Sequence, residues 1–222
     1  MAGPLREKVD RRLKEAPADP WALGALAELK AYAGEYGEAV ALLREACLKN
    51  PDDQYLRGLL VQNLMNALRD DFAKHRNLAA ELDPLIDQPA EREKYLQLVA
   101  QGLRRSGDAA GAFEILIKLN DLATLRRPDS ASNMEAVAPR HAVRRDRLIA
   151  AELAALYRGA ADADRQRFDA SIVQRRDAVL GIDTIPALQQ FNNNFAFHPE
   201  SRTTRLRLAR KFTAAQSFLE AQ

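Results

Sequence analysis

The sequence predicts an all-α fold made of short helical hairpins that stack on one another, and three observations favour this class. The 222 residues are 47% hydrophobic but only 6% aromatic, and runs of Val, Ile, Thr and aromatics that would form strands are scarce. Apolar residues recur three and four positions apart, which is the spacing of one helix face. Several landmarks also recur at intervals of about 34 residues, as expected for stacked two-helix repeats.

The stretch from Pro20 to Pro51 is the clearest unit. Its spacing predicts a first helix over 21–33 and a second helix that ends before Pro51. Gly34 stands at the turn, because glycine accepts the left-handed conformation that closes a helix. The apolar faces consist of Leu23, Leu26, Ala27 and Ala31 in the first helix and of Ala39, Leu42, Leu43 and Ala46 in the second. A hairpin of this size cannot bury both faces alone, so we expect it to stack on its neighbours.

The other elements follow the same spacing less regularly. A charged helix over 4–16 precedes the hairpin, and helical periodicity resumes over 52–68 after it, with an irregular apolar segment as far as Leu82. Further helices are expected at 91–103, 112–119, 144–159, 164–180 and 202–219. Another is expected before the last of these, with Ala187 and Phe191 at its packing positions and Pro199 as its stop. Residues 123–143 contain two prolines and a Ser/Asn/Asp cluster, which predicts an irregular loop or linker. The predicted organisation is therefore helical repeats over 1–122, a loop over 123–143, and further hairpins over 144–222.

Both ends of the chain have the register of incomplete repeats. Pro17 precedes Pro51 by 34 residues, so the first helix corresponds to the second half of a repeat. Ala187 precedes Ala221 by the same 34 residues, so the last helix corresponds to a first half. We therefore expect this chain to be a fragment of a larger protein.

The Pro20–Pro51 unit resembles the tetratricopeptide repeat, whose pattern is met by Leu26, Ala27, Gly34, Tyr36, Ala39, Leu43, Ala46 and Pro51. It departs from that pattern in the first helix, where Leu23 stands at the usual Trp position and Lys30 at a usual Tyr. The resemblance implies a right-handed α-solenoid, with irregular repeats in the second half of this chain. Residues 139–222 also resemble, more weakly, the helical region of large bacterial proteins with pyrroloquinoline-quinone-type (PQQ) β-propeller repeats. That second resemblance implies a bacterial context and no chemistry.

The tetratricopeptide resemblance implies a concave surface, formed by the first helices of successive repeats, that binds a peptide or a partner domain. It places on that surface Trp21, Glu28, Tyr32, Tyr55, Gln62, Asn66, Gln97, Gln101 and Arg104. Aromatic, amide and basic groups suit peptide recognition, although an ordinary solvated face is an alternative interpretation. The carboxylate clamp of some family members is absent, since Gly24, Glu28 and Leu59 hold its positions. We therefore expect a non-catalytic protein-interaction or scaffold module of a larger bacterial protein.

A basic cluster near the C-terminus supports an alternative function as a polyanion or nucleic-acid binding module. The cluster consists of Arg202, Arg205, Arg207, Arg210 and Lys211. A solvated or internally paired face is the competing interpretation, and the formal net charge of the whole chain is only +2. Aromatic side chains that would stack on bases fall on apolar stripes instead, so nucleic acid is the less favoured partner.

The sequence carries no pattern typical of catalysis or cofactor binding. It has no Gly-rich phosphate loop, GxSxG turn or HExxH helix, so we expect neither an enzyme nor a cofactor. His75, His141 and His198 are scattered without metal-ligand spacing, which favours structural or solvated roles and predicts no metal site. The single cysteine, Cys47, is expected to be a buried, inert thiol.

Two further expectations concern packing and location. Phe191 and Phe195 lie four residues apart and are expected in the core, with Asn192–Asn194 on a polar helix edge. No apolar run is long enough to span a membrane, so we expect no membrane insertion and a soluble segment of the cytoplasm or the periplasm.

Overall fold

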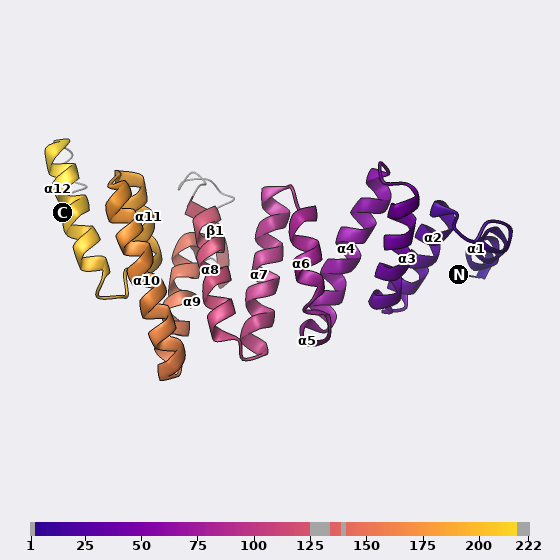
Figure 1. The fold of residues 1–222 in the computed structure, drawn as a ribbon, viewed down its shortest axis with the longest axis horizontal. Helices are drawn as coiled ribbons and strands as arrows, with labels where there is room; N and C mark the ends of the chain where they lie inside the picture. Colours follow the sequence, from indigo (N-terminus) through magenta and orange to yellow (C-terminus); the bar gives the residue numbers. More distant parts are fainter. Residues whose placement is uncertain (1–2, 125–133, 139–140, 217–222) are drawn as a thin grey trace. The chain divides into compact units, whose positions relative to one another are not determined.

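The computed structural model describes residues 3–124, 134–138 and 141–216. These residues form twelve α-helices, one short 3₁₀-helix and one β-hairpin, so the all-α class predicted from the sequence is confirmed (Figure 1). The chain divides into two compact units, Met1–Gly102 and Leu103–Gln222.

The first unit is a row of packed helices that ends within a long helix, α7. Helix α2 packs against α1 and α3, and α3 packs in turn against α4. The elements are α1 (Gly3–Glu15), α2 (Pro20–Tyr32), α3 (Tyr36–Lys49), α4 (Gln54–Asp70), α5 (Phe72–His75), α6 (Leu78–Leu82), the 3₁₀-helix η1 (Asp83–Leu85) and α7 (Pro89–Arg105).

The α2–α3 hairpin forms as predicted from the Pro20–Pro51 stretch. The carboxylate of Asp19 caps α2 by accepting a hydrogen bond of 2.9 Å from the backbone N–H of Ala22. Gly34 adopts a φ of +80°, the left-handed conformation that favours glycine. Ala27 and Ala39 are fully buried, and their small side chains let the two helix backbones approach closely.

The segment after α4 departs from a regular hairpin. Helix α4 continues to Asp70, and the chain turns at Asp71. The Asp71 carboxylate accepts a hydrogen bond of 3.0 Å from the backbone N–H of Lys74, which starts α5. The remainder of the repeat is split into α5, α6 and η1.

Several contacts hold this irregular segment to α7, and two of them involve Tyr95 and Gly102 of that helix. The hydroxyl of Tyr95 in α7 donates a hydrogen bond of 2.9 Å to the backbone carbonyl of Ala79 in α6. A Cβ built on Gly102 would lie 2.2 Å from the ring of Phe72, so a residue larger than glycine would force that ring to move. Both contacts help to fix the irregular segment against α7.

The second unit contains α8 (Ala109–Thr124), α9 (Arg145–Gly159), α10 (Asp162–Ile182), α11 (Ile185–Phe195) and α12 (Ser201–Ala214). Helix α8 packs against α9, α10 and α11, and α11 also packs against α12. Phe113 stacks on Phe168 with ring centroids 4.2 Å apart, and Phe195 lies 6.3 Å from Phe113. Phe191 and Phe195 are both buried, as predicted.

A buried polar network connects α8 with α11. The fully buried Asn120 donates a hydrogen bond to the amide oxygen of Asn194. The amide nitrogen of Asn194 in turn donates to the carboxylate of Asp121 at 2.8 Å. The prediction that Asn192–Asn194 form a polar helix edge is therefore wrong for Asn194, whose side chain meets partners on α8. Buried amides need such partners, so the network favours one register of α11 against α8.

His198 is also buried, which agrees with the structural one of the two roles, structural or solvated, that were predicted for it. Its Nε2 lies 3.0 Å from the carboxylate of Asp169, and the backbone N–H of Glu200 donates to its Nδ1 at 3.3 Å. The hydroxyl of Tyr157 donates to the same Asp169 oxygen at 2.7 Å. Burial and this hydrogen bond together raise the pKa of Tyr157.

Part of the predicted 123–143 loop is a β-hairpin. Strands β1 (Met134–Ala138) and β2 (His141–Arg144) pair antiparallel, with Glu135 opposite Val143. Glu135 also forms an ion pair of 3.3 Å with Arg145 at the start of α9. Residues 125–133 and 139–140 lie outside the described residues. The compact units divide at 102/103, whereas the sequence analysis drew its limits at 122 and 143, and those limits stay predictions.

Two further expectations concern membrane spans and the end of the chain. No helix in the described ranges is both long enough and apolar enough to cross a membrane. The helix predicted over 202–219 ends at Ala214. Ala221, on which the repeat register at this end depends, lies outside the described residues.

Candidate functional site

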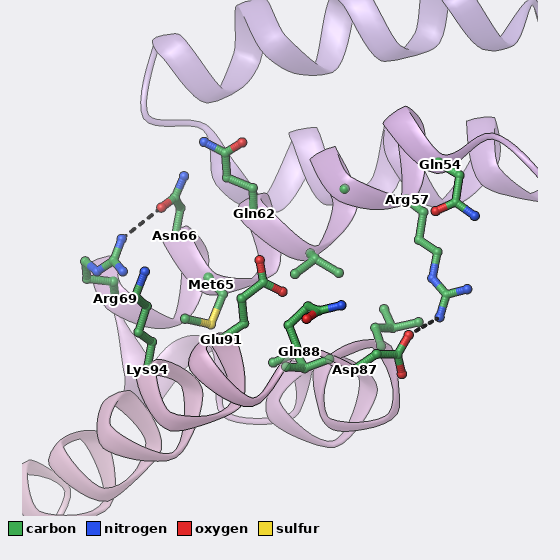
Figure 2. A pocket seen from close by; sticks show the side chains of 14 residues that line it. Gln54, Arg57, Gln62, Met65, Asn66, Arg69, Asp87, Gln88, Glu91 and Lys94 are labelled. Carbon is green, nitrogen blue, oxygen red and sulfur yellow. Dashed lines mark hydrogen bonds and ion pairs between the residues drawn. The ribbon is translucent and has the colours of Figure 1, made fainter. Parts of the chain in front are cut away.

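A groove in the first unit lies between α4 and the segment that leads from η1 into α7 (Figure 2). Its volume is about 630 Å³. It is lined on α4 by Gln54, Arg57, Gly58, Val61, Gln62, Met65, Asn66 and Arg69, and on the opposite wall by Leu85, Ile86, Asp87, Gln88, Glu91 and Lys94.

Helix α4 presents this face to the groove because its other face is buried. The carboxylate of Asp53 fixes the start of the helix by accepting hydrogen bonds of 2.9 and 3.1 Å from the backbone N–H groups of Tyr55 and Leu56. The buried residues then recur at helical spacing, as Leu56, Leu60, Asn63, Leu64, Ala67 and Leu68. Helix α4 packs against α3 and α6, which leaves its remaining polar face for the groove.

The opposite wall is short, and several contacts hold it in place. The guanidinium of Arg92 in α7 donates to the backbone carbonyl of Asp83 at 3.0 Å and to its carboxylate at 2.9 Å. The side chain of Ile86 is buried, which helps to hold the chain between η1 and α7 in place. Backbone N–H groups of Glu91 and Arg92 both donate to the carbonyl of Gln88, which starts α7. The groove is therefore built on fixed backbone on both sides.

The lining combines four apolar side chains, four amides and five charged side chains. Figure 2 shows Gln62 and Asn66 on one wall, Glu91 and Lys94 on the other, and Met65 between them. Four side-chain amides take part: Gln54, Gln62, Asn66 and Gln88. Each amide offers a hydrogen-bond donor and an acceptor, as a peptide backbone does. The charged side chains are partly engaged, since Arg57 lies 3.7 Å from Asp87 and Arg69 donates to Asn66 at 3.0 Å.

Some residues that the sequence analysis assigned to a binding surface come together. Gln62 and Asn66 both line the groove. Glu28 on α2 and Tyr55 on α4 also meet, because the Tyr55 hydroxyl donates a hydrogen bond of 2.9 Å to the Glu28 carboxylate. That hydrogen bond raises the pKa of Tyr55.

Other residues of the predicted surface do not line the groove. Trp21 is half exposed and carries the Lys8 ammonium 5.4 Å above its ring, while Tyr32 is 93% exposed. Gln97 and Gln101 lie on α7, away from the part of that helix that lines the groove. Arg104 belongs to the second unit, where it lies 3.7 Å from Glu152.

Most of the groove lining was not predicted from the sequence. Gln54 and Arg57 begin α4, and Asp87 and Gln88 belong to the connection into α7. Asp87 and Gln88 were not recognised because a regular repeat would place a second helix before the connection on which they lie. The only signal for them was the pair of prolines, Pro84 and Pro89, that brackets a short connection.

The predicted basic cluster at α12 is partly paired within the second unit. Arg207 and Lys211 lie 2.8 and 3.0 Å from the carboxylate of Asp183 and hold its pKa well below the usual range. Arg205 donates to backbone carbonyl oxygens near the start of its own helix and to the Ser201 hydroxyl. Arg202 and Arg210 are exposed. The cluster is therefore not one uniform basic surface, and polyanion binding stays a hypothesis.

The remaining candidates for chemistry are few. Among the described residues, no group of three or more His, Cys, Asp and Glu side chains is placed to hold a metal ion. Cys47 is only half-buried, so the prediction of a buried thiol is correct in part. Burial raises the pKa of this thiol, which keeps it mostly protonated at neutral pH.

Comparison with known proteins adds little to this picture. No protein-family model and no curated protein matches the chain. Among solved structures, the chain is similar to a monomeric mutant of IFIT1 determined with Gppp-AAAA, with 16% sequence identity and a TM-score of 0.27. The match covers 96% of this chain and 43% of the IFIT1 chain, so the chain spans less than half the length of that protein. A likeness of this size carries no argument about function.

Proposed function

We propose that this chain is a non-catalytic protein-interaction module that binds a peptide segment of a partner in the groove between α4 and α7. The proposal includes the right-handed, tetratricopeptide-like stacking of hairpins and a scaffolding role within a larger bacterial protein, both of which the sequence resemblance implies. The first unit supplies the binding site in this proposal.

One observation carries the proposal, which is the composition of the groove. Four apolar side chains beside four amides suit a ligand that has both apolar side chains and unpaired backbone groups. Met65 supports it further, because an unbranched thioether adapts to side chains of different shape. The charges along the walls have both signs, which favours a mixed peptide over a uniformly charged polymer.

Selection from random peptides tests the proposal, because it requires no identified partner. A display library of random dodecapeptides is selected on the full chain, and the enriched peptides are synthesised and titrated by fluorescence anisotropy. The double variant Gln62→Ala/Asn66→Ala should weaken their binding by about tenfold or more, since each lost hydrogen bond contributes about 1 kcal/mol.

The matched control is Gln101→Ala, which removes an exposed amide from α7 outside the groove. It should leave the dissociation constants unchanged. Enriched peptides that bind the double variant as tightly as the original chain would refute the groove as the binding site.

A further inference from the structure

An apolar hollow of about 550 Å³ adjoins the groove in the first unit. It lies between the end of α3, the middle of α4 and η1, and is lined by Arg44, Cys47, Leu48, Pro51, Arg57 and Leu60 together with Leu85. Arg57 and Leu85 line both the hollow and the groove. The two spaces are therefore neighbours that share these two lining residues.

Leu48 at the edge of this hollow is 81% exposed, which is unusual for a leucine. The buried face of α3 consists of Ala39, Val40, Leu43 and Ala46, and Leu48 does not belong to it. Leu60 forms part of the hollow from the core side, where it is 7% exposed. The hollow thus offers one exposed and one buried leucine to an incoming apolar group.

The two arginines of the hollow do not make it a charged site. The guanidinium of Arg44 donates to the carboxylate of Glu81 in a two-point ion pair, one contact of which measures 2.9 Å. The guanidinium of Arg57 is 3.7 Å from the carboxylate of Asp87. Because both charged ends have acidic partners outside the hollow, the aliphatic stems of these side chains are the parts available to line it.

We propose that this hollow is an anchor site for one large aliphatic or aromatic side chain of an extended peptide whose backbone lies in the adjoining groove. The inference rests on the proposed function and specifies the ligand of the same site. The amides of the groove favour an extended segment, because a helix has already satisfied its backbone groups internally and offers them no partners. The apolar hollow favours a segment with a bulky apolar residue at one position.

Two display libraries of random dodecapeptides test the anchor. One library encodes all residues except cysteine, and the other also lacks Leu, Ile, Val, Met, Phe, Tyr and Trp. Peptides enriched on the full chain from the first library should share a bulky apolar residue. Replacing that residue by Ala should raise the dissociation constant by about 10- to 100-fold, the effect of losing one buried apolar side chain.

Substitution at the hollow provides the reciprocal measurement. Leu48→Ser should weaken binding of the same peptides by about tenfold, because it removes an apolar wall that the anchor contacts. Its side chain is largely exposed, so the variant should keep the far-UV circular dichroism of the original chain. The matched control is Ile182→Ser, which removes another exposed apolar side chain, 62% exposed in α10 of the second unit, and should change nothing.

Cys47 gives a direct signal of occupancy, because it is the single cysteine of the chain and lines the hollow. A saturating enriched peptide should slow alkylation of Cys47 by iodoacetamide about tenfold or more. The reason is that the reagent reaches the thiol only in the small fraction of the chain that has no peptide bound. The same peptide with its bulky residue changed to Ala should leave the alkylation rate unchanged even at saturation.

The outcomes separate this inference from the proposed function. Peptides that depend on Gln62 and Asn66 but need no bulky residue and do not protect Cys47 would overturn the anchor and leave the groove in place. Failure of both libraries to enrich any peptide would overturn the groove and the anchor together. A dimer of the chain that dissociates in Leu48→Ser, measured by light scattering without peptide, would overturn the anchor in favour of self-association.

Discussion

Tyr95 carries a prediction that can be worked through quantitatively. Its hydroxyl donates to the backbone carbonyl of Ala79 and fastens the irregular segment to α7. The change Tyr95→Phe removes this hydrogen bond and leaves the carbonyl without its partner. At neutral pH we expect the free energy of unfolding to fall by about 1 kcal/mol.

The same hydroxyl makes the difference depend on pH. Burial raises the pKa of Tyr95 from 10.0 to about 12. The favourable contribution is therefore present below pH 10 and is lost as the pH rises towards 12, because the unfolded chain ionises first. At pH 11, which is one unit above the pKa of Tyr95 in the unfolded chain, the loss is about 1.4 kcal/mol, because one pKa unit corresponds to that free energy. The advantage of Tyr95 over Phe should thus disappear close to pH 11.

Urea denaturation followed by far-UV circular dichroism at pH 7 and pH 11 measures this change. Other groups that titrate in this range are common to both proteins, so they cancel in the difference between them. Tyr32→Phe is the matched control, because its hydroxyl is in solvent before and after unfolding, and the difference should be near zero at both pH values. A stability difference between the original chain and Tyr95→Phe that is the same at both pH values would refute the reasoning.

Three further predictions test contacts in both units. Gly102→Ala should destabilise the first unit by about 1–3 kcal/mol, because its Cβ would meet the ring of Phe72. Gly58→Ala should stabilise α4 by about 0.5–1 kcal/mol, because its Cβ meets nothing within 4 Å. Urea denaturation compares the two variants. Phe168→Ala should cost the second unit about 3–5 kcal/mol, measured in the same way, and a loss below about 1 kcal/mol would contradict its place in the core. Because the pKa of Asp183 is lowered in the folded chain, its ionised carboxylate stabilises the fold fully above the unfolded pKa of about 3.8, and this stabilisation is lost as the pH falls below that value. Asp183→Asn should therefore lower the melting temperature at pH 6 more than at pH 3.

The regular parts of the fold could be predicted from the sequence because their signals are local. Gly34, the small residues Ala27 and Ala39, and the apolar spacing around them define the α2–α3 hairpin without reference to the rest of the chain. The stacked aromatic core of the second unit was anticipated in part, through Phe191 and Phe195. Local periodicity therefore accounts for most helices and their buried faces.

The features that were missed depend on distant partners. Asn194 looks like a surface residue in a run of three asparagines, and only the position of Asn120 on α8 makes it a core residue. The groove depends on the path of α5, α6 and η1, where short apolar runs fit a helix as well as a broken one. Gln62 and Asn66 were identified because they lie on a regular helix, whereas Asp87 and Gln88 lie on a connection whose course has no periodic signal.

The single tryptophan, Trp21, has a practical consequence for studies of this chain. It lies in the first unit, half exposed beneath the ammonium of Lys8. Its emission therefore monitors the α1–α2 corner, while the second unit, with α8 through α12, contains no residue that contributes to that signal. Comparing the emission transition with the loss of helical dichroism shows whether the two units unfold together. Coincident transitions indicate one cooperative body, and separated transitions indicate two bodies of unequal stability.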